Sequence, residues 1–212
     1  MTKPNYTHLA LVVDRSGSMH SIQKDAEGGI NNLIKEQAAV PGEITVSLYQ
    51  FDTVYERVFG PINASDAPLY GLHPRGMTAL LDATARAITE TGEYLTSKPE
   101  SERPSKVVFA IVTDGAENSS REVNKAQVKE MVTKQTNEYN WEFVYIGANL
   151  DAMAEANSMG IASSVQYHST GASVQGLYAG VSRSLTDSRV HNVNLASTVA
   201  SEYTEDGEEI RK

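Results

Sequence analysis

Two runs of consecutive apolar residues, each followed by an aspartate, constrain the fold of this chain more than any other feature. The first run covers residues 9–13 and stops at Asp14, and the second covers residues 107–112 and is followed by Asp114. Because the apolar residues are continuous rather than alternating, both runs are predicted to be central strands of a parallel sheet that is covered on both faces. Each aspartate then lies at the carboxyl end of a strand, where open α/β sheets bind their ligands.

The rest of the chain alternates predicted strands with predicted helices. The strands are expected at residues 7–14, 43–52, 53–59, 106–113, 141–146 and 165–168. The helices are expected at residues 22–39, 79–96, 121–138, 151–159 and 171–185. Since the second and third strands are joined too closely for a crossover, they should form an antiparallel hairpin. The predicted fold class is therefore α/β, a doubly wound, Rossmann-like and mostly parallel sheet with one antiparallel edge strand and helices on both faces.

The composition excludes several classes of function. The formal net charge is −9, so neither nucleic acid nor an anionic membrane is an expected partner. The absence of cysteine excludes disulfides, thiolate metal sites and a cysteine nucleophile. The apolar run that follows the polar N-terminal residues is too short for a signal peptide or a membrane span, and we therefore expect a soluble, cytoplasmic protein.

The loop after the first predicted strand carries side-chain oxygens at alternating positions. Asp14, Ser16 and Ser18 follow one another with Gly17 between the two serines. An extended or looped backbone can point all three oxygens the same way, and oxygen-only ligands suit a hard cation such as Mg²⁺. Taken alone, this stretch is also compatible with a helix cap at Asp14 and with serines that only shape a turn.

Two further segments extend this pattern. Gly76-Met77-Thr78 stands before the second large predicted helix, and Thr113-Asp114-Gly115 ends the strand before the third. Together with Asp14-x-Ser16-x-Ser18, and in this order, they resemble the metal-ion-dependent adhesion site of the von Willebrand factor A family. The resemblance covers residues 6–186, and residues 143–152 are similar to stand-alone bacterial and phage members of that family.

The resemblance implies a metal site and a role for each matching residue. The hydroxyls of Ser16 and Ser18 would bind the metal directly, and Thr78 would bind it directly or through water. Asp14 and Asp114 would mostly hold metal-bound waters and orient the serines. The cation would be Mg²⁺, with Mn²⁺ or Ca²⁺ as alternatives, and its remaining position would take an Asp or Glu carboxylate from a partner protein. Because neutral hydroxyls leave the ion most of its charge, this ligand set favours the binding of one further carboxylate.

The resemblance also divides the chain. Residues 1–186 are expected to form a von Willebrand factor A domain, and residues 187–212 a C-terminal extension. Five carboxylates lie between residues 202 and 209, so the acidic end is predicted to be disordered. A carboxylate of this end is also a candidate to occupy the metal site of a neighbouring molecule, which would give self-association.

Three functions are compatible with such a site. The first is a metal-dependent protein-binding module for adhesion or scaffolding, and the second is a structural component of a phage or other multi-protein assembly in which the metal only pins loops. The third is a metal-dependent, phosphatase-like enzyme, which is not expected because Ser16 stands where aspartyl-phosphate enzymes usually have a second acid. The chain also lacks the Gly-x-x-x-x-Gly-Lys-Ser/Thr phosphate loop, and Ser16 lacks the Gly-x-Ser-x-Gly context of a hydrolase nucleophile.

Several other residues receive structural interpretations. Arg15 is interpreted as a solvated loop side chain and Asp52 as a turn residue. His20 and His73 flank the metal loops and are expected at the surface. Gly28-Gly29 is interpreted as a place where the first helix packs closely onto the sheet.

Polar residues around the second and third helices have two interpretations each. Thr78 is expected to cap the second helix as well as to bind metal. Glu117 and Asn118 are candidates for the rim of the site, and capping of the third helix by Asn118 or Ser119 is the alternative.

Overall fold

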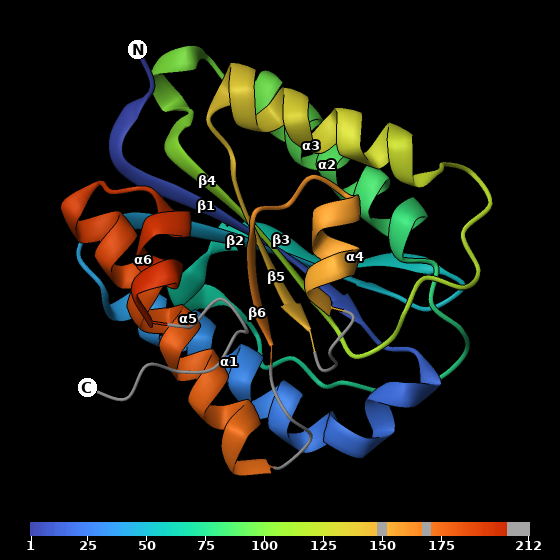
Figure 1. The fold of residues 1–212 in the computed structure, drawn as a ribbon. Helices are drawn as coiled ribbons and strands as arrows, with labels where there is room; N and C mark the ends of the chain where they lie inside the picture. The colour runs from blue at the N-terminus through green and yellow to red at the C-terminus, as the bar shows by residue number, and fades with distance from the viewer. Residues whose placement is uncertain (148–151, 167–170, 203–212) are drawn as a thin grey trace.

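The structure, a computed structural model, describes residues 1–147, 152–166 and 171–202. Its six-stranded sheet has the order β3-β2-β1-β4-β5-β6 (Figure 1). The strands are β1 (Lys3–Asp14), β2 (Glu43–Phe51), β3 (Tyr55–Asn63), β4 (Pro104–Thr113), β5 (Glu142–Gly147) and β6 (Ser163–Gln166). Neighbouring strands are parallel except β2 and β3, which form the expected antiparallel hairpin at one edge.

Helices cover both faces of this sheet, so the predicted α/β fold class is confirmed. The helices are α1 (Gln23–Ala39), α2 (Leu80–Thr96), α3 (Lys125–Tyr139), α4 (Ala152–Ser158), α5 (Gly171–His191) and α6 (Leu195–Glu202), with three short 3-10 helices, η1 (Gly17–Ile22), η2 (Ala64–Asp66) and η3 (Glu100–Glu102). One face carries α1, α5 and α6, and the other carries α2, α3 and α4 (Figure 1). None of the helices within the described ranges has a stretch long and apolar enough to cross a membrane.

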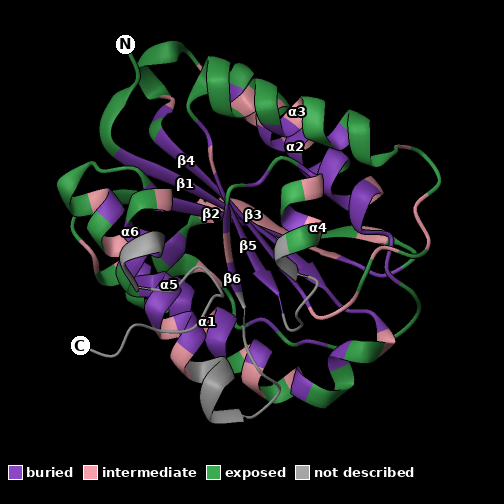
Figure 2. Ribbon diagram, in the orientation of Figure 1, coloured by how far each residue is buried: buried purple, intermediate pink, exposed green. Residues whose placement is uncertain are grey.

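Strand β1 shows why its apolar run is continuous. Leu9, Leu11 and Val13 pack in the core on the side of α1 and α5. Ala10 and Val12 pack in the core on the side of α2 and α3. All five residues are buried, as are most residues of the neighbouring strands β2 and β4 (Figure 2). Consecutive residues of a strand point to opposite faces, and a strand covered on both faces therefore needs apolar residues at every position.

The strand order reverses between β1 and β4. After β3 the chain returns across β1 and continues outward through β4, β5 and β6. Val13 of β1 pairs with Val112 of β4, so Asp14 and Asp114 leave the sheet close together. Such a reversal opens a crevice at the carboxyl ends of the strands, which is where doubly wound sheets bind ligands.

The C-terminal part of the chain differs most from the prediction. Helix α5 continues to His191 instead of ending at residue 185, and α6 follows it, so the boundary placed after residue 186 falls inside α5. Leu195 and Val199 of α6 are buried in the core that α1 and α5 share. Residues 203–212, which hold most of the acidic end, lie outside the described residues.

The two adjacent glycines of α1 differ in their surroundings. A Cβ atom on Gly29 would lie 2.2 Å from the ring of Tyr178 on α5, whereas one on Gly28 would meet nothing within 4 Å. The expected close packing therefore exists, but it joins α1 to α5 and involves Gly29 alone. The expectation that this pair packs onto the sheet was wrong, because the Tyr178 ring occupies the space beside the helix.

Candidate metal centre

All five residues of the candidate metal site lie at the carboxyl edge of β1 and β4. Asp14 ends β1, and Ser16 and Ser18 stand at the start of η1. Asp114 directly follows β4, and Thr78 lies two residues before α2. The structure thus brings together side chains from three segments that are far apart in the sequence.

Asp14 is completely buried, and its two carboxylate oxygens accept different hydrogen bonds. Oδ1 accepts from the backbone N–H of Ser16 at 2.6 Å, and Oδ2 accepts from the hydroxyl of Thr113 at 2.6 Å. Burial raises the pKa of Asp14 to about 6, although both hydrogen bonds act in the opposite direction. The carboxylate is therefore held rigidly in a place where its negative charge is poorly solvated.

Ser18 links the other side chains of the first loop to β4. Its hydroxyl lies 3.0 Å from the hydroxyl of Ser16 and donates to Oδ1 of Asp114 at 2.6 Å. Burial also raises the pKa of the Asp114 carboxyl, against the hydrogen bond from Ser18. Neighbouring oxygens of an octahedral Mg²⁺ site are about 2.9 Å apart, so the spacing of the two serine hydroxyls suits such an ion.

Gly115 lies close to several of these oxygens. A Cβ atom at this position would lie 3.2 Å from Oγ1 of Thr78, 3.3 Å from Oγ of Ser18 and 3.8 Å from Oδ2 of Asp14. Oxygens from the first loop and from the Thr78 segment therefore approach Gly115 of the third segment closely, and a larger side chain at this position would crowd them. Thr78 is only 2% exposed, and its hydroxyl makes no hydrogen bond to any residue that the structure describes.

The donor set points to a hard cation. It combines two carboxylates with three neutral hydroxyls, and it contains no nitrogen or sulfur ligand. In the described part of the chain, no three His, Cys, Asp or Glu side chains cluster in a way that could hold a metal ion. Any metal at this edge must therefore depend on hydroxyl oxygens, which are ligands typical of Mg²⁺ and related ions.

Arg15 and Asp52 form a buried ion pair beside the site. Arg15 is 5% exposed, its Nε lies 3.1 Å from Oδ2 of Asp52, and its Nη1 lies 2.8 Å from Oε2 of Glu56. The interpretation of Arg15 as a solvated side chain was wrong, because carboxylates of the β2–β3 hairpin surround it. Asp52 is a turn residue, as expected, since Oδ1 accepts from the backbone N–H of Val54 at 2.6 Å.

Asp52 also receives a second arginine. Nε of Arg75 donates to its Oδ2 at 2.7 Å. Burial raises the pKa of Asp52, but the hydrogen bonds from Arg75 and Val54 and the charge of Arg15 together lower it below its usual value. Backbone hydrogen bonds from Arg75 to Arg15 (2.6 Å) and from Ala79 to Asp52 (3.0 Å) hold the same loops. The first loop and the Thr78 segment are thus fixed against the hairpin.

The loop after β4 supplies the caps at the start of α2. The backbone N–H of Leu81 donates to Oε2 of Glu117 and to the hydroxyl of Ser120. Thr78 makes no capping hydrogen bond, so its predicted capping role was wrong; its hydroxyl is turned toward Gly115 instead. The cap of α3 is Asn124, not Asn118 or Ser119, because α3 begins only at Lys125 and the backbone N–H groups of residues 121–123 donate to Asp82 of α2.

The hydrogen-bonding roles of two neighbours, Thr113 and Asn118, were not predicted from the sequence. Thr113 binds Asp14, and Asn118 accepts a hydrogen bond from the backbone N–H of Thr78. For Thr113, the only signal in the sequence is its position at a strand end beside Asp114. For Asn118, nothing in the neighbouring sequence indicates that it contacts Thr78. His20 and His73 are exposed, as expected.

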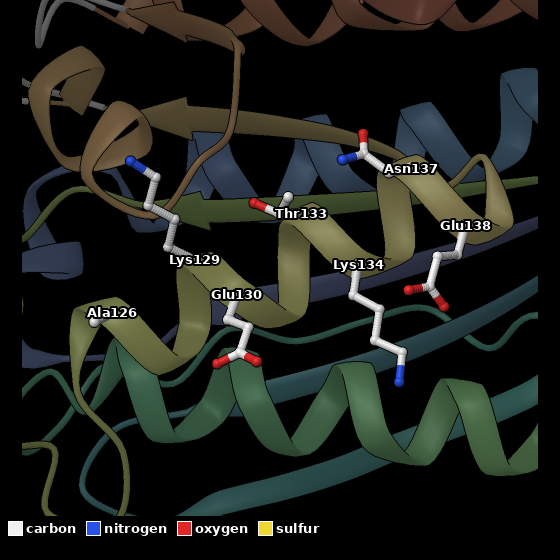
Figure 3. Close-up of a pocket in the computed structure, with 7 residues that line it drawn as sticks. All are labelled: Ala126, Lys129, Glu130, Thr133, Lys134, Asn137 and Glu138. Carbon is white, nitrogen blue, oxygen red and sulfur yellow. The ribbon is translucent and has the colours of Figure 1, made fainter.

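A surface hollow on α3 is unrelated to this site. It is lined from one helix alone, and its side chains point outward from the exposed face of α3 (Figure 3). The lining residues are Ala126, Lys129, Glu130, Thr133, Lys134, Asn137 and Glu138. Because acidic and basic side chains alternate there, the hollow has the character of an ordinary solvated helix face.

Several solved structures share the fold of this chain. A von Willebrand factor type A protein from Catenulispora acidiphila has a TM-score of 0.58 at 13% identity, over 95% of this chain and 44% of that one. Proximal thread matrix protein 1 from the mussel byssus, with a zinc-occupied MIDAS motif, has a TM-score of 0.58 at 16% identity, over 85% and 46%. Manganese-loaded Plasmodium vivax TRAP protein has a TM-score of 0.53 at 16% identity, over 81% and 72%.

These likenesses show that the chain has the fold of a von Willebrand factor A domain. It spans less than half the length of the first two of these proteins. Comparison with models of protein families found no match, and neither did comparison with curated proteins.

Proposed function

We propose that this protein is a metal-dependent protein-binding module. A divalent cation would be held by Asp14, Ser16, Ser18, Thr78 and Asp114 and would accept an Asp or Glu carboxylate from a partner protein. The observation that carries the proposal is the convergence of oxygens from Asp14, Ser18 and Thr78 on one point beside Gly115, which belongs to the third segment.

Each residue has a distinct task in this proposal. The hydroxyls of Ser16, Ser18 and Thr78 would be the direct ligands, since those of Ser18 and Thr78 converge beside Gly115 and that of Ser16 lies 3.0 Å from the Ser18 hydroxyl. Asp14 would act mainly through its charge, because Thr113 and the Ser16 N–H already occupy its oxygens. Asp114 would orient the Ser18 hydroxyl. When bound, the cation supplies a positive centre for the partner's carboxylate, and neutral protein ligands leave that centre strong.

The fold neighbours support the metal and the binding role in general terms. Two of them are described as carrying zinc or manganese, and another is the pilus adhesin SpaC from Lactobacillus rhamnosus GG, with a TM-score of 0.60 at 14% identity over 87% of this chain and 31% of that one. We propose Mg²⁺ for this chain because its donors are all hard oxygens, with Mn²⁺ and Ca²⁺ as alternatives.

The direct test is the Thr78→Val variant, which keeps the shape of the side chain and removes the hydroxyl. We expect its dissociation constant for Mn²⁺, measured by electron paramagnetic resonance or calorimetry, to rise at least tenfold while the circular dichroism spectrum stays unchanged. Thr89→Val on α2 is the matched control, because among the described residues the Thr89 hydroxyl bonds only to the Ala85 carbonyl. Equal affinities of the wild-type protein and Thr78→Val would contradict the proposed site.

A second experiment separates the proposed roles. Proteins captured from a lysate in Mg²⁺ and lost in a chelator would support a binding module and could then be identified. A large metal-dependent rise in melting temperature without any metal-dependent partner would favour the structural alternative. Turnover of a phosphatase substrate in Mg²⁺ or Mn²⁺ would favour an enzyme. Removal of residues 203–212 tests self-association, which should disappear if that end supplies the carboxylate.

A further inference from the structure

The Thr78 hydroxyl is positioned differently from the two serine hydroxyls. Ser16 and Ser18 bond to each other, and Ser18 bonds to Asp114. The Thr78 hydroxyl has no hydrogen-bond partner among the residues that the structure describes. Its place in the site must therefore be set by the backbone that carries it.

That backbone is held on both sides by one residue of the loop after β4. The N–H of Thr78 donates to Oδ1 of Asn118 at 2.9 Å, and the N–H of Asn118 donates to the carbonyl of Thr78 at 3.0 Å. The N–H of Ser119 reaches the same carbonyl at 3.2 Å. Asn118 follows Asp114 by four positions, so these bonds join two of the three metal segments directly.

Two carboxylates extend the connection along the first turn of α2. Glu117 accepts from the N–H of Leu81 at 2.9 Å and from that of Ser120 at 2.7 Å. Asp82 accepts from three consecutive backbone N–H groups, those of residues 121–123, at 2.7–3.0 Å. Negative charge is favourable at a helix N-terminus. The loop after β4 and the start of α2 are therefore joined by hydrogen bonds in both directions.

We propose that Asn118 is a positioning residue for the metal site. Its carboxamide oxygen fixes the Thr78 peptide so that the Thr78 hydroxyl faces the same point beside Gly115 as Ser18 and Asp14 do. The affinity for a divalent cation then depends on a side chain that does not touch the ion. This inference rests on the metal site of the proposed function, and the side chain of Asn118 is solvent-exposed, so it can be replaced without opening the core.

The test compares two asparagines of the same loop. Asn118→Ala removes the acceptor for the Thr78 N–H, and we expect about a tenfold rise in the dissociation constant for Mn²⁺, the usual size for a lost partner of a metal ligand. Asn118→Asp keeps an acceptor oxygen and should bind Mn²⁺ nearly as well as the wild type. Asn124→Ala removes the cap of α3, where Asn124 accepts from the N–H of Gln127 at 3.1 Å; it should lower the melting temperature and leave Mn²⁺ affinity unchanged.

The outcomes separate this inference from the proposed function. If the wild-type protein does not bind Mn²⁺, the proposed metal site itself is wrong, and the inference is overturned with it. If the wild type binds but Asn118→Ala binds equally well, only the positioning role is overturned. The role is also overturned if Asn118→Ala and Asn124→Ala weaken binding to the same extent, because the effect is then general loosening of the loop.

Discussion

The two ends of the central strands both carry buried charged side chains, but the charges are satisfied in different ways. At the amino end of β4, the ammonium group of Lys106 donates to Oε1 of Glu142 (2.8 Å), to the hydroxyl of Ser188 (2.8 Å) and to the carbonyl of Val193 (3.0 Å). All three ammonium donors are thus used within the chain. Oε2 of Glu142 accepts from the N–H of Leu195, so the cluster also fastens α6 to the sheet.

At the carboxyl end of β1, the charge of Asp14 is not neutralised by a cation within the described residues. Asp14 makes no ion pair with any residue in the described part of the chain, and its oxygens accept only from an N–H and a hydroxyl. The nearby arginines, Arg15 and Arg75, pair with Asp52 and Glu56 instead. The comparison teaches that a buried charge with a partner in the chain, such as Lys106, stabilises the fold. A buried charge such as Asp14 instead favours the binding of a cation from solution.

The largest expected effect comes from breaking the internally neutralised cluster. Lys106→Met should lower the free energy of unfolding by about 3–5 kcal/mol, because it leaves the Glu142 carboxylate buried without its cation. Urea denaturation measures this change. Adding Glu142→Gln should recover part of the loss, since the amide oxygen still accepts from Leu195. Mn²⁺ affinity should stay unchanged, and a loss below 1 kcal/mol would mean that the cluster adds little to stability.

Removal of a buried charge at the carboxyl end of β1 should have the opposite effect: little change in stability and a large loss of Mn²⁺ affinity. Asp14→Asn removes a buried charge, so we expect unchanged or higher stability without metal and at least a hundredfold loss of Mn²⁺ affinity, about 2.7 kcal/mol. Calorimetric titration and thermal melts in a chelator measure the two quantities. Asp66→Asn, at an exposed position, is the control. A large loss of stability in the chelator would show that the two ends do not differ as described.

His8 lies between the two ends, in the middle of β1, and should add a pH dependence that is independent of metal. Burial lowers its pKa to about 4, with a smaller effect from Lys98, while its Nδ1 lies 2.9 Å from the Thr45 hydroxyl. The unfolded chain binds the proton with a pKa near 6.5, so stability is complete above pH 6.5 and is lost as the pH falls toward 4.

The difference between the folded and unfolded pKa values of His8 predicts that the free energy of unfolding falls by about 2 kcal/mol between pH 7 and pH 5. His8→Phe should remove that part of the loss, and Thr45 keeps its contact with the Tyr6 hydroxyl. Denaturation of both proteins at the two pH values, in a chelator, gives the difference. Identical pH profiles would show that the folded protein accepts the proton at His8.

The smallest effects are expected in the helix layer, away from both ends. Gly29→Ala should cost about 1–3 kcal/mol because its Cβ would overlap the Tyr178 ring. Gly28→Ala, one residue earlier in open space, should stabilise α1 by about 0.5–1 kcal/mol. Thermal melts distinguish the two signs. Neither change should affect Mn²⁺ affinity, and a loss of affinity in Gly29→Ala would show that helix packing and the metal edge are coupled.

Sequence patterns predicted those parts of the molecule that depend on local order. The continuous apolar runs identified β1 and β4 as strands buried on both faces, and the reversal rule for doubly wound sheets placed Asp14 beside Asp114. The burial of Arg15 could not be predicted in this way, because it depends on Asp52 and Glu56 in a hairpin that is remote in the sequence.

The length of α5 was missed for a related reason. Its last three turns bury polar side chains, among them Ser182 and Ser188, so the apolar periodicity fades although the helix continues. These side chains are satisfied by distant partners: Gln37 of α1 donates to the Ser182 carbonyl, and Lys106 donates to the Ser188 hydroxyl. Hydrophobic patterns identify a helix through its apolar face, and they fail where the buried face is polar.

The candidate site is divided between the ends of β1 and β4. Under the proposed function, metal binding would therefore report when these two strands pair during folding. Asp14, Ser16 and Ser18 reach their final places beside Asp114 only after β4 has paired with β1, which lies far away in the sequence. Pairings between distant segments form slowly, because the entropy of closing the intervening loop opposes them. A refolding chain would acquire tight Mn²⁺ binding when β1 and β4 pair. The rate at which Mn²⁺ binding appears would then measure this pairing separately from the formation of the helices.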